Sequence, residues 1–234
     1  MTERSRASLS RDASHFGVGP SHLHWDGDTL TIEVDEWSNP LPRPVRGTIR
    51  VHPRSLSART WALDANARHH WGPLAPSARV ELQLSHPGLR WQGDGYFDSN
   101  EGSEPIERPF ASWDWSRSIL ADGSSAVLYD VRQKAGDDRL LALRFAPDGT
   151  VSDFPADPRH TLPPTFWRVP RQMRSADTPQ LLETLEDTPF YQRAVLQATL
   201  SGERALTFHE SLDVSKLERL STRLMLPWRM PRVR

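Results

Sequence analysis

The sequence predicts an all-β protein, and three features support that prediction. Proline accounts for 20 of the 234 residues and tryptophan for 9. Long amphipathic helical patterns are almost absent, whereas short runs of alternating apolar and polar residues recur along the chain. Such alternation is typical of half-buried strands, and Pro-rich connections are typical of the turns between them.

Each expected strand places apolar side chains on one face. Leu30, Ile32 and Val34 alternate with Thr31 and Glu33, for example. The segment Ser-His-Pro-Gly at 85–88 predicts a turn, as do the segments at 135–138 and 147–149. The strands are expected at 28–36, 45–53, 77–84, 88–98, 125–133, 139–145, 166–173, 191–200 and 203–212.

The C-terminal part contains the one good helical pattern, which predicts a short helix over 214–225 with Asp213 as its N-cap. In all, about ten or eleven strands are expected from the alternating runs. One closed barrel of eight strands would use most of them, whereas two complete barrels would need about sixteen.

Composition excludes several classes of protein. The net charge is -1 and arginine is spread along the chain, so no basic face for nucleic acid is expected. The absence of cysteine excludes disulfides and thiolate metal sites. No run of about 18 apolar residues predicts a membrane-spanning helix. The first residues lack the apolar run of a signal peptide, so a cytoplasmic protein is expected.

The segment GYFDSNEGSEPIERPFASWDWSR (95–117) combines five carboxylates with five aromatic residues. On a strand, Tyr96 and Asp98 point to the same face. If that face is enclosed, burial raises the pKa of Asp98 and keeps the carboxyl neutral, as a proton donor requires. From spacing alone, the simpler interpretation is a solvated Asp98 that opens an Asp-Ser-Asn turn.

The segment HHWGPLAP (69–76) places His69 and Trp71 on one face of a strand and His70 on the other. A metal site there would need further ligands, such as His52, His86 or His209, and none has a recognised ligand spacing. The simpler interpretation is a structural histidine beside a packed tryptophan.

Trp113 and Trp115 share a face in the segment WDWSR, and Asp114 points away. This pattern indicates core packing or a stacking platform for a sugar. A glycosidase, however, needs two carboxyls that flank one bond. Earlier in the chain, three glutamates follow one another at a spacing of three in a loop that contains Pro and Gly: Glu101, Glu104 and Glu107. This pattern indicates solvated residues.

Two features near the C-terminus stand apart from these segments. On the strand 203–212, His209 and Glu210 point to opposite faces, and His209 is expected to be an ordinary strand residue. The apolar and basic tail 225–234 is suited to contact with a membrane surface or a partner.

Taken in order, several segments resemble the carotenoid 1,2-hydratase family, also called hydroxyneurosporene synthase. The resemblance begins near residue 17 and runs to the C-terminus. The ordered set is specific, although no single segment decides it. The segments are VGPSHLHWDGDTL, HHWGPLAP, GYFDSNEGSEPIERPFASWDWSR, VLYDV, YQRAVL, HESL and LPWRMPR.

The resemblance implies two lipocalin-like antiparallel β-barrel domains packed together, with residues 1–86 as a partial N-terminal domain and 87–234 as the C-terminal domain. Family members usually carry a further N-terminal segment, so the first barrel is expected to be incomplete. The implied reaction adds water across the terminal 1,2 double bond of an acyclic carotenoid of the neurosporene or lycopene type. No cofactor and no metal are expected.

Residue by residue, the resemblance implies that Asp98 is the acid and that Tyr96, His69 and Trp71 belong to the catalytic site. We expect Trp71 and Tyr96 to stabilise a developing cation through their faces. His69 is the expected residue for orienting the water or bonding to Asp98. The expected substrate-binding residues are Phe97, Trp113 and Trp115.

An acyclic carotenoid is dissolved in the membrane, so peripheral contact of the protein with the inner face of the cytoplasmic membrane is expected. Three rival functions remain. A carotenoid or lipid carrier of the same fold would need no acid, and a cyclase would add no water to its product. A glycosidase would act on sugars and is the least favoured.

Overall fold

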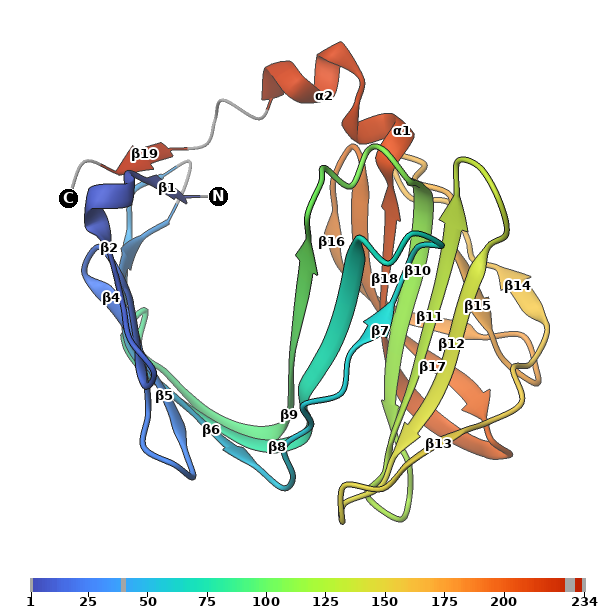
Figure 1. Cartoon of the computed structure of the whole chain (residues 1–234), viewed down its shortest axis with the longest axis horizontal. Coiled ribbons are helices and arrows are strands. Elements are labelled where there is room, and N and C mark those ends of the chain that lie inside the picture. Colours follow the sequence, from blue (N-terminus) through green and yellow to red (C-terminus); the bar gives the residue numbers. More distant parts are fainter. Residues whose placement is uncertain (1, 39–40, 226–229, 233–234) are drawn as a thin grey trace.

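The computed structural model describes residues 2–38, 41–225 and 230–232. Two large antiparallel sheets lie next to each other, and the chain completes the first before it builds the second (Figure 1). Among the described residues, helices are confined to one short 3-10 turn, η1 (Arg6–Ser8), and to two short segments near the C-terminus, α1 (Val214–Leu217) and α2 (Leu220–Met225). The prediction of an all-β fold is therefore confirmed.

The first sheet is strongly curved and has eight strands (Figure 1). Its last two long strands form a hairpin, in which β9 pairs with β8 along most of its length. The strands, in spatial order, are β2 (Leu9–Arg11), β3 (His15–Val18), β4 (Ser21–Trp25), β5 (Leu30–Trp37), β6 (Pro44–Pro53), β8 (His69–His86) and β7 (Trp61–Ala62), with β9 (Leu89–Gly102) attached to β8.

The second sheet has seven strands. Two small pairs complete the structure: β14 (Arg159–Thr161) with β15 (Gln172–Arg174), and β1 (Thr2–Arg4) with β19 (Met230–Arg232). The seven strands, in spatial order, are β13 (Val151–Asp153), β12 (Arg139–Phe145), β11 (Ser125–Gln133), β10 (Phe110–Ile119), β18 (Glu203–Asp213), β17 (Tyr191–Leu200) and β16 (Gln180–Asp187).

Both faces of the seven-stranded sheet are covered. One face packs against β7 and β8 through a cluster of rings in which Trp71 contacts Trp61, Tyr129 and Phe145. The other face packs against the segment that contains β14 and β15, where the core residues are mainly aliphatic. Burial of large rings makes the first contact the main apolar link between the two sheets.

Several expected strands coincide with observed ones, including 125–133, 139–145 and 191–200. The observed strands outnumber the ten or eleven expected, because short strands such as β2 and β3 carry too few residues to show alternation. Among the described strands, no pairing closes either sheet into a barrel.

Two expected elements were wrong. The run 166–173 is not a strand: only Gln172–Arg174 pairs, and Phe166 and Trp167 are exposed in a turn that ends at Arg168 with a φ of 51°. The single helix expected over 214–225 is two helices, because Arg219 N–H bonds to the Lys216 carbonyl and breaks the α-helical pattern.

The N-cap prediction is confirmed, since Asp213 accepts a hydrogen bond of 3.1 Å from the Lys216 backbone N–H. The predicted boundary between residues 86 and 87 falls in the turn of the β8–β9 hairpin, and the division into two domains stays a prediction.

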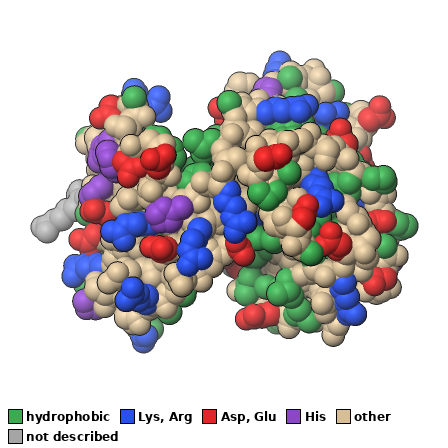
Figure 2. Space-filling model, turned by 90° about the horizontal axis from the view of Figure 1, so that it is seen from below, with side chains coloured by type: hydrophobic (Ala, Val, Ile, Leu, Met, Phe, Trp, Pro, Cys, Tyr) green, Lys and Arg blue, Asp and Glu red, His purple; other side chains and the backbone are tan. Residues whose placement is uncertain are grey.

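Within the described part of the chain, no helix has the length and apolar character needed to cross a membrane. Most of the apolar and basic tail noted in the sequence, residues 226–229 and 233–234, lies outside the described residues. The face seen from below shows acidic and basic side chains interspersed, with hydrophobic side chains exposed among them (Figure 2).

Candidate active site

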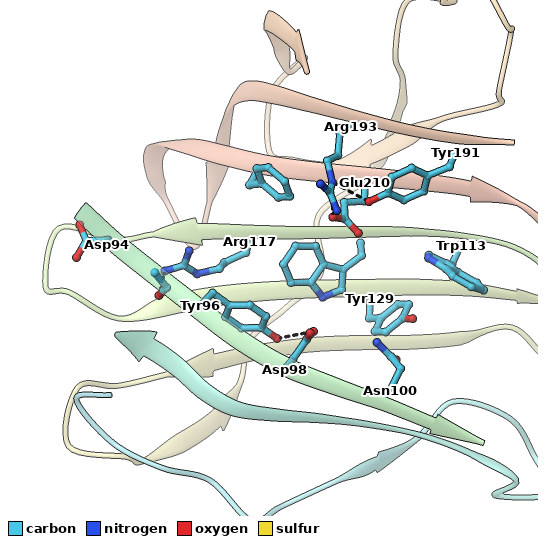
Figure 3. Close-up of a pocket in the computed structure, with 13 residues that line it drawn as sticks. Asp94, Tyr96, Asp98, Asn100, Trp113, Arg117, Tyr129, Tyr191, Arg193 and Glu210 are labelled. Carbon is cyan, nitrogen blue, oxygen red and sulfur yellow. Dashed lines mark hydrogen bonds and ion pairs between the residues drawn. The ribbon is translucent and has the colours of Figure 1, made fainter. Parts of the chain in front are cut away.

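A cavity of about 420 Å³ lies between β9 and the face of the seven-stranded sheet (Figure 3). One wall comes from β9, and the opposite wall comes from β10, β11, β17 and β18. Both polar and aromatic side chains reach into it. The lining residues are Asp94, Gly95, Tyr96, Asp98, Asn100, Trp113, Trp115, Arg117, Tyr129, Tyr191, Arg193, Phe208 and Glu210.

Strand alternation places Tyr96, Asp98 and Asn100 on the cavity side of β9. Gly95, immediately before them, lies so close to β8 that a Cβ there would overlap the Val80 side chain. Its carbonyl accepts a hydrogen bond of 3.0 Å from Arg117 on β10. The glycine therefore lets β9 lie close to Val80 of β8 and to Arg117 of β10, which helps to position Asp98 in the cavity.

Asp98 is held by two hydrogen bonds to the same oxygen. Trp71 Nε1 donates to Asp98 Oδ2 at 2.7 Å, and the Tyr96 hydroxyl donates to Oδ2 at 3.1 Å. Because both donors use Oδ2, a proton on the neutral carboxyl is carried by Oδ1. The carboxyl is thus presented as a donor with a fixed orientation.

The surroundings of Asp98 favour its neutral form. Burial raises the pKa of Asp98, and the negative charge of Glu210 raises it further, while the bonds from Trp71 and Tyr96 partly lower it. Burial and the nearby Asp98 charge also raise the pKa of the Tyr96 hydroxyl, which keeps that hydroxyl a hydrogen-bond donor.

The opposite wall contains a row of directly opposed residues on four neighbouring strands. Tyr129 on β11 faces Trp115 on β10, Trp115 faces Glu210 on β18, and Glu210 faces Arg193 on β17. Arg193 Nε donates to Glu210 Oε1 at 3.0 Å and to the Tyr191 hydroxyl at 2.8 Å. The register of three strand pairs, β10–β11, β10–β18 and β17–β18, therefore determines which side chains lie next to one another on this wall.

The cavity continues at both ends. At one end, Arg117 and Phe208 also line a groove of about 560 Å³, to which Ile119, Val195 and Leu206 contribute apolar side chains. At the other end, the cavity shares residues with a smaller space of about 210 Å³, lined in part by Asn100, Trp113 and Tyr129. The central cavity therefore has a neighbouring space at each end.

Two of the seven residues predicted for the site, Tyr96 and Asp98, are joined by a direct hydrogen bond, and Trp113 and Trp115 line the same cavity. Trp71 is in contact with Asp98 through its N–H, but its ring is fully buried among other rings and does not face the cavity. The face of the Trp71 ring is therefore not exposed to the cavity, where the expected contact with a cation would take place.

Phe97 and His69 lie elsewhere. Phe97 points to the other face of β9, where it packs against Val51 and Ala75. His69 lines the smaller neighbouring space, and its Nε2 lies 2.9 Å from the Glu104 carbonyl oxygen. With that bond, His69 anchors the loop that follows β9, as a structural histidine does.

The described residues contain no group of three or more His, Asp or Glu side chains that could hold a metal ion. Asp114 and His209, on the far face of the sheet, belong to a separate buried network in which Ser211 donates to Asp114 Oδ1 at 2.6 Å and lies 3.1 Å from His209 Nε2. Arg132 pairs with the same aspartate at 2.9 Å.

Comparison with known proteins identifies the family to which the chain belongs. The family model described as "Carotenoid hydratase CrtC" matches residues 1–234. The chain belongs to the carotenoid hydratase family. The family resemblance seen in the sequence is thereby confirmed.

Two relatives named "Acyclic carotenoid 1,2-hydratase" are similar to most of the chain. The relative from Rubrivivax gelatinosus is 51% identical over 99% of this chain, and that from Thiocapsa roseopersicina is 48% identical over 100%. The chain spans 58% of the length of each of these relatives. A third, from Cereibacter sphaeroides, is 36% identical, and the chain spans 84% of it.

Among solved structures, a Nitrosomonas europaea protein assigned as AttH is similar with a TM-score of 0.60 and 14% sequence identity, over 89% of this chain and 72% of that one. This similarity supports the lipocalin-like fold alone. Sequence reasoning missed Glu210, Arg193 and Tyr191 as cavity residues. The alternation on β17 and β18 carried that signal.

Proposed function

We propose that the chain carries the active site of a hydratase that adds water across the terminal 1,2 double bond of an acyclic carotenoid, of the neurosporene or lycopene type, by acid catalysis. One observation carries the proposal: Asp98 is a half-buried carboxyl with a raised pKa, held by Trp71 and Tyr96 at the edge of an aromatic cavity. Family membership supports the same activity.

The chemistry explains why these groups are needed. A trisubstituted alkene is a weak base, so protonation requires a strong, neutral donor in a dry site. Asp98 delivers its proton to the less substituted alkene carbon, the one nearer the polyene, and a tertiary cation forms on the terminal carbon, which carries two methyl groups. The faces of Trp113 and Trp115 stabilise that cation by about 2 kcal/mol or more when water is excluded. Electrostatic preorganisation of this kind is usually a large catalytic term.

The shape of the site suits a long apolar substrate. The central cavity holds the reacting end, and the groove at Ile119, Val195 and Leu206 receives the polyene that follows it. This assignment is supported by the residues that the cavity and the groove share, Arg117 and Phe208 among them.

We also propose that the protein meets a membrane surface, at the inner face of the cytoplasmic membrane. Phe166 is 85% exposed and contacts the Trp167 ring edge to face. Lys216 of α1 bonds to the Trp167 and Arg168 carbonyls at 2.7 and 2.6 Å, which fixes this turn beside the helix. We call the exposed apolar and basic residues of this turn and of the helical segment that follows Lys216 the aromatic-basic patch: Phe166, Trp167, Arg168, Arg219, Leu220, Arg223 and Leu224. Apolar rings with cations are suited to an anionic lipid surface.

The test is expression of this chain in cells that accumulate lycopene or neurosporene, with the pigments separated by liquid chromatography and identified by mass. We expect a product heavier by one water from the wild-type chain and none from Asp98→Asn. The matched control is Asp137→Asn, which changes an exposed turn acid.

Other results would identify other functions. Hydration that persists in Asp98→Asn would remove Asp98 as the acid and keep the hydratase. A rearranged product of unchanged mass would indicate a cyclase. Bound pigment without any product would indicate a carotenoid carrier and would contradict the proposed activity.

A further inference from the structure

Glu210 lies across the cavity from Asp98, on the wall built by the second sheet (Figure 3). Asp98 belongs to β9 and Glu210 to β18, so the two carboxyls reach the cavity from different sheets. Their charges interact, since Glu210 contributes to the raised pKa of Asp98. A site with two facing carboxyls in different surroundings can separate the roles of acid and base.

Arg193 and Tyr191 hold Glu210 in place. Arg193 Nε bonds to Glu210 Oε1 at 3.0 Å. Burial, the charge of Glu210 and a hydrogen bond to Glu210 together raise the pKa of the Tyr191 hydroxyl. The side chain of Glu210 therefore has a fixed position and a charged partner, although it is only partly buried.

Trp115 provides a second observation at the same place. Its side chain is 8% exposed, it lines the cavity, and its Nε1 has no hydrogen-bond acceptor among the described residues. A buried N–H without an acceptor is uncommon and calls for an explanation, such as a water or ligand oxygen. Trp115 faces Glu210 directly across the β10–β18 pair, so their side chains are neighbours.

We propose that Trp115 Nε1 and Glu210 together bind the attacking water, and that Glu210 accepts its proton. The water accepts a hydrogen bond from Trp115 Nε1 and donates one to the Glu210 carboxylate, which leaves a lone pair free to attack. This inference rests on the proposed hydratase activity and assigns the role of base to Glu210. His69, the candidate expected from the sequence, lines the neighbouring space and bonds to the Glu104 carbonyl.

The step balances as follows. The π electron pair of the alkene forms a C–H bond with the proton of Asp98, which becomes a carboxylate. A lone pair of the water forms the C–O bond to the tertiary cation, and one water proton passes to Glu210. Exchange with solvent then returns a proton to Asp98 and removes one from Glu210. Attack on a cation makes the bound water strongly acidic, so the Glu210 carboxylate can accept its proton.

The test separates the two proton transfers by running the reaction in D₂O. Protonation by Asp98 without water attack is reversible, because the cation can lose a proton and return the alkene with deuterium in it. In Glu210→Gln, which keeps the shape of the side chain and can still accept from Arg193, we expect hydrate formation to fall about 100-fold. Deuterium should still enter the recovered substrate. Asp98→Asn should show neither hydrate nor deuterium.

Two further variants define the role of Glu210. Glu186→Gln is the matched control, since it removes an exposed carboxylate 3.8 Å from the same Arg193 and should leave both readouts at the wild-type level. Trp115→Phe removes the N–H donor and keeps a smaller aromatic face at the same position, so it should also lower hydration more than deuterium entry, which keeps the test valid if Glu210→Gln does not fold.

Two results would overturn the inference: wild-type hydration in Glu210→Gln, or an equal loss of hydration and deuterium entry. An equal loss would mean that Glu210 acts on the acid or on the fold. A wild-type chain that forms no hydrate and incorporates no deuterium would instead overturn the proposed function, and the inference with it. Retained deuterium entry with lost hydration is the outcome that only a water-activating group explains.

Discussion

Trp71 Nε1 donates a 2.7 Å hydrogen bond to Asp98 Oδ2 from a ring that is itself fully buried. The tryptophan comes from β8 and the aspartate from β9, so the hairpin carries both partners. Because the indole cannot move within its packed cluster, it fixes one carboxyl oxygen and leaves the other to hold the proton.

Trp71→Phe should shift the pH dependence of hydration. The lost N–H stabilised the carboxylate form, so its removal raises the pKa of Asp98 and keeps the acid protonated to higher pH. We expect the alkaline limb of the pH–activity profile to move to higher pH, with a lower maximal rate from poorer orientation. Trp61→Phe, in the same ring cluster without a bond to Asp98, is the control. An unmoved limb in Trp71→Phe would contradict the role of this bond.

The groove beyond the cavity should affect long substrates selectively. Leu206 is 62% exposed and lines the groove, so Leu206→Glu adds a charge there without disturbing the core. We expect KM to rise several-fold for a full-length polyene and to stay constant for a short alkene that fills only the central cavity. Leu182→Glu, at an exposed position on β16, is the control. Equal changes in KM for both substrates would show that the polyene does not follow the groove.

The aromatic-basic patch should contribute to vesicle binding. Phe166→Ser with Trp167→Ser removes two exposed rings, and we expect at least a tenfold weaker association with vesicles of anionic lipid in a sedimentation assay, at about 1.4 kcal/mol per tenfold change. Leu41→Ser with Leu56→Ser removes two exposed leucines from the first sheet and serves as the control. Equal losses in the two double variants would point to nonspecific adsorption.

His209 should make the fold sensitive to acid. Burial, and secondarily the nearby Arg171 charge, lowers its pKa from 6.5 to about 3. The unfolded chain therefore binds a proton between those values and the folded chain does not, so stability is full above pH 6.5 and declines as pH falls toward 3.

Between pH 7 and 5 this difference amounts to about 2 kcal/mol for the one group. In His209→Asn, the decline in the free energy of unfolding between those pH values should be smaller than in the wild type by about that amount. Denaturant unfolding at each pH provides the measurement. His24→Asn, at an exposed histidine, should leave the decline unchanged. A parallel decline in wild type and His209→Asn would show that His209 is protonated in the folded state.

The sequence predicted correctly which side chains lie on the same face of a strand. Alternation on β9 and β10 placed Tyr96 with Asp98 and Trp113 with Trp115, and the structure confirms both pairs in one cavity. The sequence left open whether Asp98 is enclosed or solvated, and the structure decides this: burial raises the pKa of Asp98.

Register could not be predicted in the same way. Alternation assigns a residue to a face but does not say which residue on the next strand lies opposite it. The row that joins Trp115, Glu210 and Arg193 depends on the pairing of β10, β18 and β17, which are far apart in the sequence. Similarly, Trp71 meets Asp98 edge-on through its N–H, because its ring is already packed among the rings of both sheets.

The strand that carries Asp98 belongs to the first sheet, whereas the wall that carries Glu210 belongs to the second. Among the described strands, β9 pairs with β8 alone, so no backbone ladder ties it to β10. Side-chain contacts, such as that of Arg117 with the Gly95 carbonyl, therefore help to set the gap between the two carboxyls. The two carboxyls thus sit on separately built walls. A substitution where the two sheets meet would change the distance between Asp98 and Glu210 without altering any residue that lines the cavity.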